Sequence, residues 1–142
     1  MLTSDNKARL RRCLDSFLKE QTSRAGELHR VAKELGVVPI TDDWNRVFGI
    51  RVSDGRVVSF NRIEPFDLQV VTVPNAELAA LGHAWTRFPE LAPLVPRRPA
   101  EAIICPACNG SGLATHREGP KDFSCYCGGL GWLLPEGWLK RS

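Results

Sequence analysis

Apolar residues recur at helical spacing over the first 35 positions of the chain. Between Ser4 and Leu35 they stand three or four residues apart and would line one face of a helix: Leu10, Cys13, Leu14, Phe17 and Leu18, then Ala25, Leu28, Val31, Ala32 and Leu35. Ser4 or Asp5 can cap the start of this segment, and Gly36 is a typical C-terminal stop. The polar residues 21–23 interrupt the pattern, so the sequence allows one kinked helix or two helices.

Beyond position 45 the pattern becomes β-rich. Residues 46–52 and 56–61 flank Ser53-Asp54-Gly55. An Asp-Gly pair between such runs predicts a hairpin, because glycine tolerates the positive φ that a tight turn needs. Residues 68–73 would form a third strand and complete a small antiparallel sheet.

A further helix is expected after this sheet. Asn75 can cap a helix that runs from Ala76 to about Phe88, and its core-facing residues would be Leu78, Leu81, Trp85 and Phe88. Three prolines then confine the chain to short turns: Pro89, Pro93 and Pro96. Residues 96–102, Pro-Arg-Arg-Pro-Ala-Glu-Ala, indicate a stiff linker.

These elements predict an α+β protein in three parts. Residues 1–95 would be the α+β body, with a helical segment, a small antiparallel sheet and a helix. Residues 96–102 would be the linker, and residues 103–142 would form a small cysteine-rich module with a tryptophan-rich tail. This tail, which contains Trp132 and Trp138, either packs back onto the body or presents an apolar patch to a partner.

The composition is that of a globular protein. Of the 142 residues, 43% are hydrophobic and 25% are charged, which argues against wholesale disorder. Apolar runs such as Leu130 to Leu134 are far shorter than the roughly 18 residues that span a bilayer. The N-terminal residues lead directly into a charged amphipathic segment without an apolar h-region, so no signal peptide is expected. Four of the five cysteines fall within residues 105–127, which favours metal ligands in a reducing compartment, and we expect a cytoplasmic protein.

The clustered cysteines form two short units, each followed by glycines. The first is Cys105-Pro-Ala-Cys108-Asn-Gly-Ser-Gly, and the second is Cys125-Tyr-Cys127-Gly-Gly-Leu-Gly. Two thiolates from each of two tight turns can complete a tetrahedral zinc shell, while the glycines allow positive φ and offer N–H groups to the sulfurs. The sequence therefore predicts one structural Zn²⁺ held by Cys105, Cys108, Cys125 and Cys127. Because four protein ligands leave no open coordination position, catalysis by this metal is not expected.

Three alternatives concern the cysteines and their surroundings. The four clustered cysteines could form two disulfides or remain buried thiols. His116 lies between the two units and could replace one cysteine as a ligand. Cys13 lies on the apolar helix face and is expected to be a small buried residue, although a reactive thiol is the other possibility.

The first cysteine unit resembles the zinc-binding repeat of the DnaJ chaperones, CxxCxGxG. Residues 105–112 match that repeat at every defined position. The second unit departs from it, because Ser124 stands where the family places its first cysteine and Cys125 follows one residue later. The resemblance implies the four cysteine ligands. It does not imply co-chaperone activity, because the chain contains no His-Pro-Asp signature.

The N-terminal part loosely resembles the opening of the SUKH immunity superfamily, bacterial proteins that bind and neutralise toxins. The similar features are a helix, then Leu35-Gly36-Val37-Val38-Pro39 and Asp43-Trp44, and then a strand hairpin. The Asn-Gly that usually follows the proline in that family is missing here. This resemblance implies that the chain binds another protein.

The charge of the chain gives little support to nucleic-acid binding. Four zinc-bound thiolates and one Zn²⁺ would lower the formal net charge from +3 to about +1, and affinity for a polyanion scales with the phosphates neutralised. No catalytic motif is evident, so an enzyme is not expected. We expect a non-catalytic protein-interaction protein, an adaptor, immunity or chaperone-like protein. The alternative is a nucleic-acid-binding regulatory protein that uses the zinc units and the basic N-terminal segment.

Overall fold

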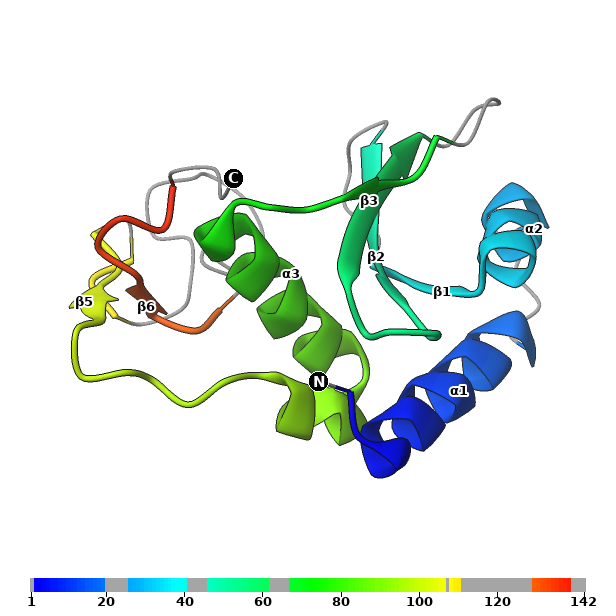
Figure 1. Ribbon diagram of the computed structural model, residues 1–142, viewed down its shortest axis with the longest axis horizontal. Coiled ribbons are helices and arrows are strands. Elements are labelled where there is room, and N and C mark those ends of the chain that lie inside the picture. The colour runs from blue at the N-terminus through cyan, green and yellow to red at the C-terminus, as the bar shows by residue number, and fades with distance from the viewer. Residues whose placement is uncertain are drawn as a thin grey trace. The chain divides into compact units, whose positions relative to one another are not determined.

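The computed structural model describes residues 2–19, 26–40, 46–61, 67–106, 108–110 and 129–138 (Figure 1). Within these ranges the fold is α+β, as the sequence predicts: helices accompany a small antiparallel sheet. The chain divides into two compact units, Met1–Val71 and Thr72–Ser142. This division falls before the last long helix rather than at the expected linker. None of the helices in the described ranges is both long and apolar enough to cross a bilayer.

Two helices begin the first unit, α1 (Ser4–Lys19) and α2 (Gly26–Leu35). The joining residues 20–25 lie outside the described part, so the structure describes two helices and not their connection. The apolar face of α1 is buried as expected, and Cys13 on it is 1% exposed. Gly36 has a φ of +63° at the end of α2, which confirms it as the stop.

The start of α1 differs from the prediction. The residue that caps the helix is Thr3, because the Asn6 backbone N–H donates to Thr3 Oγ1 at 3.1 Å. Ser4 and Asp5, which the sequence pattern suggested as caps, lie inside the first turn. The hydroxyl of Thr3 satisfies one of the helix's unpaired N–H groups, which is the physical role expected of an N-cap.

Four antiparallel strands follow in the simple order β1-β2-β3-β4: β1 (Val37–Ile40), β2 (Arg46–Arg51), β3 (Val57–Asn61) and β4 (Gln69–Val70). The β2–β3 hairpin is confirmed, whereas the third predicted strand, residues 68–73, is reduced to two residues. The sequence pattern did not predict β1. Its position at the edge of the sheet allows Pro39, which lacks an N–H, to be part of a strand.

The β2–β3 turn is held by Asp54 and Gly55. Gly55 has a φ of +73°, and its N–H donates to the Arg51 carbonyl oxygen at 2.7 Å. Asp54 accepts from the Arg51 guanidinium and, at 3.1 Å, from the Arg56 backbone N–H. The Arg51 hydrogen bond is the largest influence that lowers the pKa of Asp54 from its usual value. This local network explains why the Asp-Gly signal was sufficient to predict the turn.

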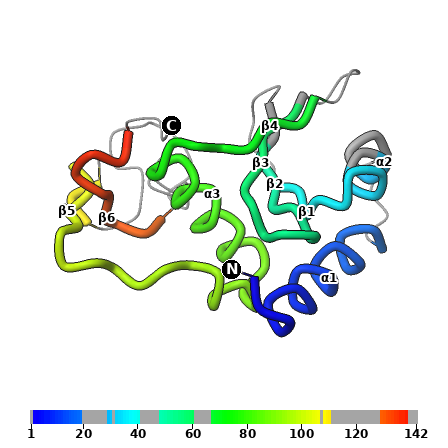
Figure 2. The backbone as a smooth tube through the Cα atoms, viewed as in Figure 1, coloured from blue at the N-terminus to red at the C-terminus, as the bar shows by residue number. Residues whose placement is uncertain are grey.

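The second unit contains α3 (Pro74–Arg87), a 3₁₀ helix η1 (Pro89–Leu94), and the paired strands β5 (Ile103–Ile104) and β6 (Trp132–Leu133) (Figure 2). Three of the four expected core positions of α3 are buried: Leu78, Leu81 and Phe88. Trp85 is 44% exposed, so its assignment to the core was wrong. Asn75 does not cap α3, because Val73 occupies the cap position, with Pro74 at the start of the helix.

Candidate metal centre

The Cys105–Cys108 turn follows directly after β5. Both cysteines are buried, with 0% and 2% of their surface exposed, and they cluster with Leu133 of β6. The Cys105 backbone N–H donates to the Gly131 carbonyl oxygen at 3.0 Å. Cys105 and Cys108 are not joined in a disulfide. Two thiols are therefore enclosed at one end of a short two-stranded sheet.

Strand pairing brings the first cysteine unit beside the end of the second cysteine unit. Ile103 pairs with Leu133 and Ile104 with Trp132 in antiparallel register. β5 immediately precedes Cys105, and β6 immediately follows Gly131, the last glycine of the second cysteine unit. The sequence predicted no such pairing, because neither two-residue strand carries a recognisable period.

Glycines of the two cysteine units pack against each other through their backbones. Gly110, Gly129 and Gly131 have φ values of +85°, +82° and +82°, which confirms the predicted left-handed backbone at these positions. A Cβ on Gly131 would lie 2.6 Å from the Gly110 carbonyl oxygen. The close approach of the two cysteine units therefore requires glycine at position 131, because the residue has a positive φ and because a side chain there would clash with Gly110.

The four predicted ligands are only partly visible in the structure. Cys105 and Cys108 lie together, whereas Cys125, Cys127 and the alternative ligand His116 lie outside the described residues. Within the described ranges, no group of three or more His, Cys, Asp or Glu side chains is placed to hold a metal ion. The four-cysteine zinc site therefore stays a prediction.

Asn75 connects α3 to the segment that follows β6. Its Nδ2 donates to the Leu134 carbonyl oxygen at 3.1 Å, and the Leu134 N–H donates to its Oδ1 at 2.9 Å. Its backbone N–H donates to the Gly137 carbonyl oxygen at 2.8 Å. Asn75 is fully buried, and a Cβ on Gly137 would overlap its carboxamide. The sequence pattern indicated Asn75 only as a helix cap, because nothing local signals a partner 59 residues away.

These contacts decide how the tryptophan-rich tail is placed. Trp132 and Leu133 are 8% and 3% exposed, so this part of the tail packs back onto α3 and its surroundings, one of the two expected possibilities. Trp138 is 50% exposed. The tail is therefore buried along β6, whereas Trp138 lies at the surface.

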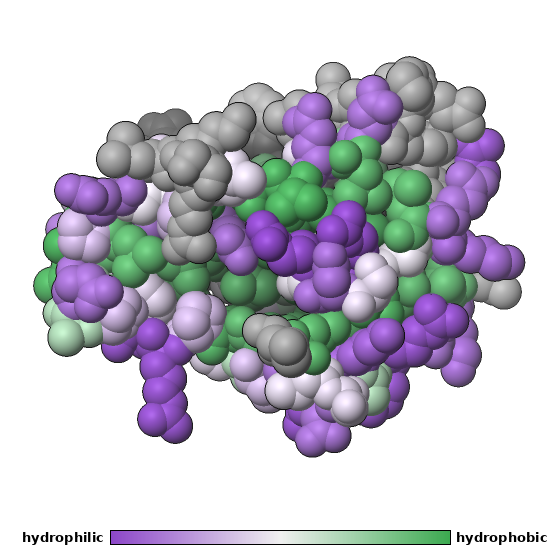
Figure 3. Space-filling model, in the orientation of Figure 1, coloured by the Kyte–Doolittle hydropathy of each residue, from purple (hydrophilic) through white to green (hydrophobic). Residues whose placement is uncertain are grey.

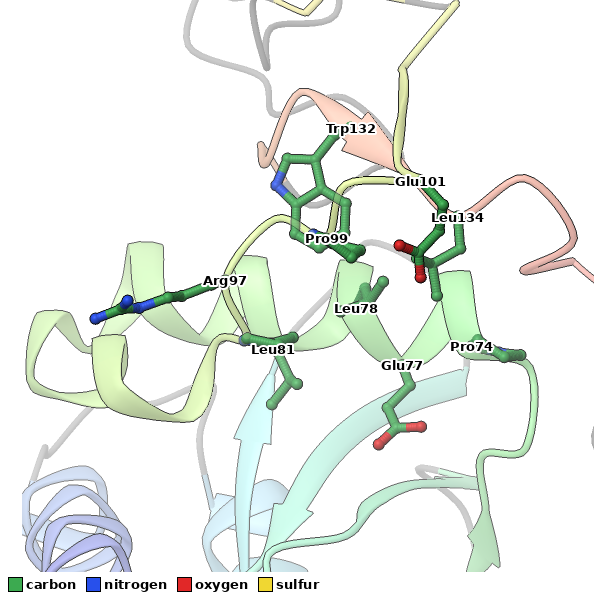
Figure 4. Close-up of a pocket in the computed structure, with 10 residues that line it drawn as sticks. Pro74, Glu77, Leu78, Leu81, Arg97, Pro99, Glu101, Trp132 and Leu134 are labelled. Atoms are coloured by element: carbon green, nitrogen blue, oxygen red, sulfur yellow. The ribbon is translucent and has the colours of Figure 1, made fainter.

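A groove lies between α3, residues 96–101 and β6, with a volume of about 350 Å³ (Figure 4). Its apolar lining comes from leucines of α3 and from the residues around β6, together with three prolines: Leu78, Leu81, Trp132, Leu134, Pro74, Pro96 and Pro99. Glu77, Arg97 and Glu101 add charged groups. The residues expected to form a linker are thus one wall of a groove.

A second apolar surface lies at β5. Ile103 and Ile104 are 45% and 58% exposed, and apolar atoms are visible at the left end of Figure 3, where Figure 1 places β5. Pairing with a further strand is restricted there, because Pro106 has no N–H and the Ala102 N–H donates to the Pro99 carbonyl oxygen at 3.1 Å. The groove is therefore the better developed binding surface.

Comparison with protein-family models, with curated proteins and with solved structures finds no match to this chain.

Proposed function

We propose that this chain is a non-catalytic protein-interaction protein of the cytoplasm, with one structural Zn²⁺ bound by Cys105, Cys108, Cys125 and Cys127. The observation that carries the proposal is the β5–β6 pairing, which holds a buried cysteine pair next to the glycines of the second cysteine unit. Cys127 stands two positions before Gly129. Two residues of chain span at most about 7 Å, so the proposal needs only a short reach between the two units.

Energetics support a metal at this position. Two-residue strands contribute little stability by themselves, because isolated two-stranded pairs are marginal in water. The buried cluster around the thiols contains only Cys105, Cys108 and Leu133 among the described residues. Structural zinc supplies on the order of 10 kcal/mol to small modules of this kind. Four thiolate ligands would also exclude water and substrate from the metal, which is why we assign it no catalytic role.

The protein-binding part of the proposal rests on the second compact unit, Thr72–Ser142. An apolar groove bordered by α3 and β6 offers a surface that zinc would hold in shape. Zinc binding requires that all four cysteine ligands are reduced, which agrees with a reducing compartment such as the cytoplasm. The alternative, a nucleic-acid-binding protein, has less support because two of the three charged groups at the groove are carboxylates.

The zinc site is tested by metal analysis of the natively purified full chain. We expect about one zinc per chain, and a clear loss in the single variants Cys105→Ser and Cys127→Ser. Cys13→Ala is the matched control, because Cys13 lies in α1 and is expected to leave the zinc content unchanged. Zinc-free native protein with four titratable thiols in residues 105–127 would contradict the proposal, as would full zinc content in both serine variants.

Partner binding is tested by affinity capture from the native host in the presence of RNase and DNase. The intact chain is compared with a Cys105→Ser/Cys127→Ser variant. We expect one protein that is recovered only with the intact chain and that rebinds in purified form at a stoichiometric ratio. Recovery that depends on nucleic acid would favour the alternative, and the absence of any specific partner would contradict the interaction function.

A further inference from the structure

The groove of the second unit has the size and lining of a binding site. Its volume of about 350 Å³ falls at the lower end of the range for ligand pockets, roughly 300–1,000 Å³. Leu78, Leu81 and Trp132 on its walls are 7%, 9% and 8% exposed, so their side chains are already packed before anything binds. An apolar side chain that enters the groove would therefore meet fixed surfaces on both sides (Figure 4).

The walls of the groove are held in place by contacts that do not depend on a ligand. Pro96 and Pro99 restrict the backbone of residues 96–101, and a hydrogen bond from Ala102 to Pro99 closes the following turn. The Asn75 hydrogen bonds fix Leu134 at the opposite wall. A preformed groove binds a flexible segment at lower entropic cost, because only the ligand must be ordered.

The charged groups are separated along the groove. In Figure 4, Glu101 lies beside Leu134 on the Trp132 side of α3, Glu77 points away from that side, and Arg97 lies at the other end of the groove. Among the described residues, neither carboxylate takes part in an ion pair or a side-chain hydrogen bond. A carboxylate without a partner beside an apolar surface, such as Glu101, attracts a cationic group and repels phosphates.

We propose that this groove binds an extended segment of a partner protein in which an apolar side chain and a Lys or Arg are separated by one residue. In an extended segment, side chains two positions apart point to the same side and lie about 7 Å apart. The apolar side chain would lie against Trp132 and Leu78, and the cationic group would pair with Glu101. This inference rests on the proposed protein-interaction function and names the partner chemistry at that surface.

The test uses the zinc-loaded full chain and three capped synthetic peptides as probes. The first is Gly-Leu-Ser-Lys-Gly, the second replaces Lys with Glu, and the third replaces Leu with Ser. Binding is followed by the indole N–H resonance of Trp132 in ¹H–¹⁵N spectra, assigned with Trp132→Phe. We expect the first peptide to shift this resonance and to bind about tenfold more tightly than either of the others.

A charge-reversal variant supplies the decisive comparison. Glu101→Lys should weaken binding of the lysine peptide about tenfold and strengthen binding of the glutamate peptide. Glu136→Lys is the matched control, because Glu136 is exposed and does not line the groove, and it should leave both affinities unchanged. Equal binding of the lysine and glutamate peptides, or identical affinities of Glu101→Lys and the unmodified chain, would overturn the inference.

Failure of this inference can be distinguished from failure of the proposed function. Zinc content and partner capture are measured on the same Glu101→Lys preparation. If zinc is retained and the captured partner still binds as tightly as to the unmodified chain, the groove is not the binding site, but the protein-interaction function stands. If the unmodified chain has neither zinc nor a partner, the proposed function itself fails.

Discussion

The Asn75 side chain offers the most specific test of how the second unit is held together. Replacing it with alanine removes two hydrogen bonds to Leu134 but keeps the backbone bond from residue 75 to Gly137. The Leu134 carbonyl oxygen retains a partner, because the Gly137 N–H also donates to it at 3.1 Å. The Leu134 N–H loses its Oδ1 acceptor. The two lost bonds therefore have different costs.

The expected destabilisation follows from these two groups. A buried N–H left without a partner costs about 1–3 kcal/mol, and the bond lost at the carbonyl contributes about 0.5–1.5 kcal/mol. Leu134 is only half-buried, so water can partly replace the lost bonds. We therefore expect Asn75→Ala to lower the free energy of unfolding of the second unit by about 2–3 kcal/mol.

The measurement combines urea unfolding of the zinc-loaded full chain with hydrogen exchange at the Leu134 amide. Asn75→Ala should lower the unfolding midpoint and strongly reduce protection at this amide. Thr86→Ala is the matched control on the same helix, because the Thr86 hydroxyl donates only to Gly82 one turn earlier, and its removal should cost well under about 1 kcal/mol. An Asn75→Ala variant with unchanged midpoint and unchanged Leu134 protection would show that these two hydrogen bonds do not stabilise the second unit.

Three further outcomes are expected. Gly137→Ala should destabilise the second unit because its Cβ overlaps the Asn75 carboxamide, and Asn75→Ala should relieve that overlap, so the double variant should unfold no more easily than Asn75→Ala alone; additive losses in urea unfolding would contradict this. Because hydrogen bonding from Arg51 lowers the folded-state pKa of Asp54, the stabilisation is present above the usual pKa of 3.8 and is lost as pH falls through the lower folded value. Both side chains are partly exposed, so Asp54→Asn should remove only about 0.5 kcal/mol of acid-sensitive stability between pH 6 and pH 3; an unchanged pH dependence of unfolding would count against the ion pair. Strong chelation should abolish amide protection in β5 and β6 and leave β2–β3 protected, and full protection of β5 and β6 in chelator would argue against structural zinc.

Several parts of the fold could be predicted because their causes are local in the chain. The periodic apolar residues of α1, the stop at Gly36 and the turn at Asp54-Gly55 each depend on neighbours within a few positions. The positive φ at Gly110, Gly129 and Gly131 was likewise predictable, since the spacing of cysteines and glycines already implied a backbone that folds back on itself.

Other parts were missed because their causes are distant. β1 contains Pro39 and has no alternating pattern, and it forms only because β2 offers a partner at the sheet edge. Trp85 has helical spacing like Leu78 and Leu81, yet it is exposed, because spacing shows which residues share a stripe and not where the buried stripe ends.

Residue type and short spacing are enough to predict the helical segments, the hairpin and the candidate ligands Cys105, Cys108, Cys125 and Cys127. Long-range packing, by contrast, sets the pairing of β5 with β6, the binding of Asn75 to Leu134 and Gly137 instead of its own helix end, and the position of residues 96–101 in one wall of a groove. Each of these features joins segments that are tens of residues apart. Their energy comes from buried hydrogen bonds and close backbone approach, which exist only after the chain has folded and which no local pattern encodes.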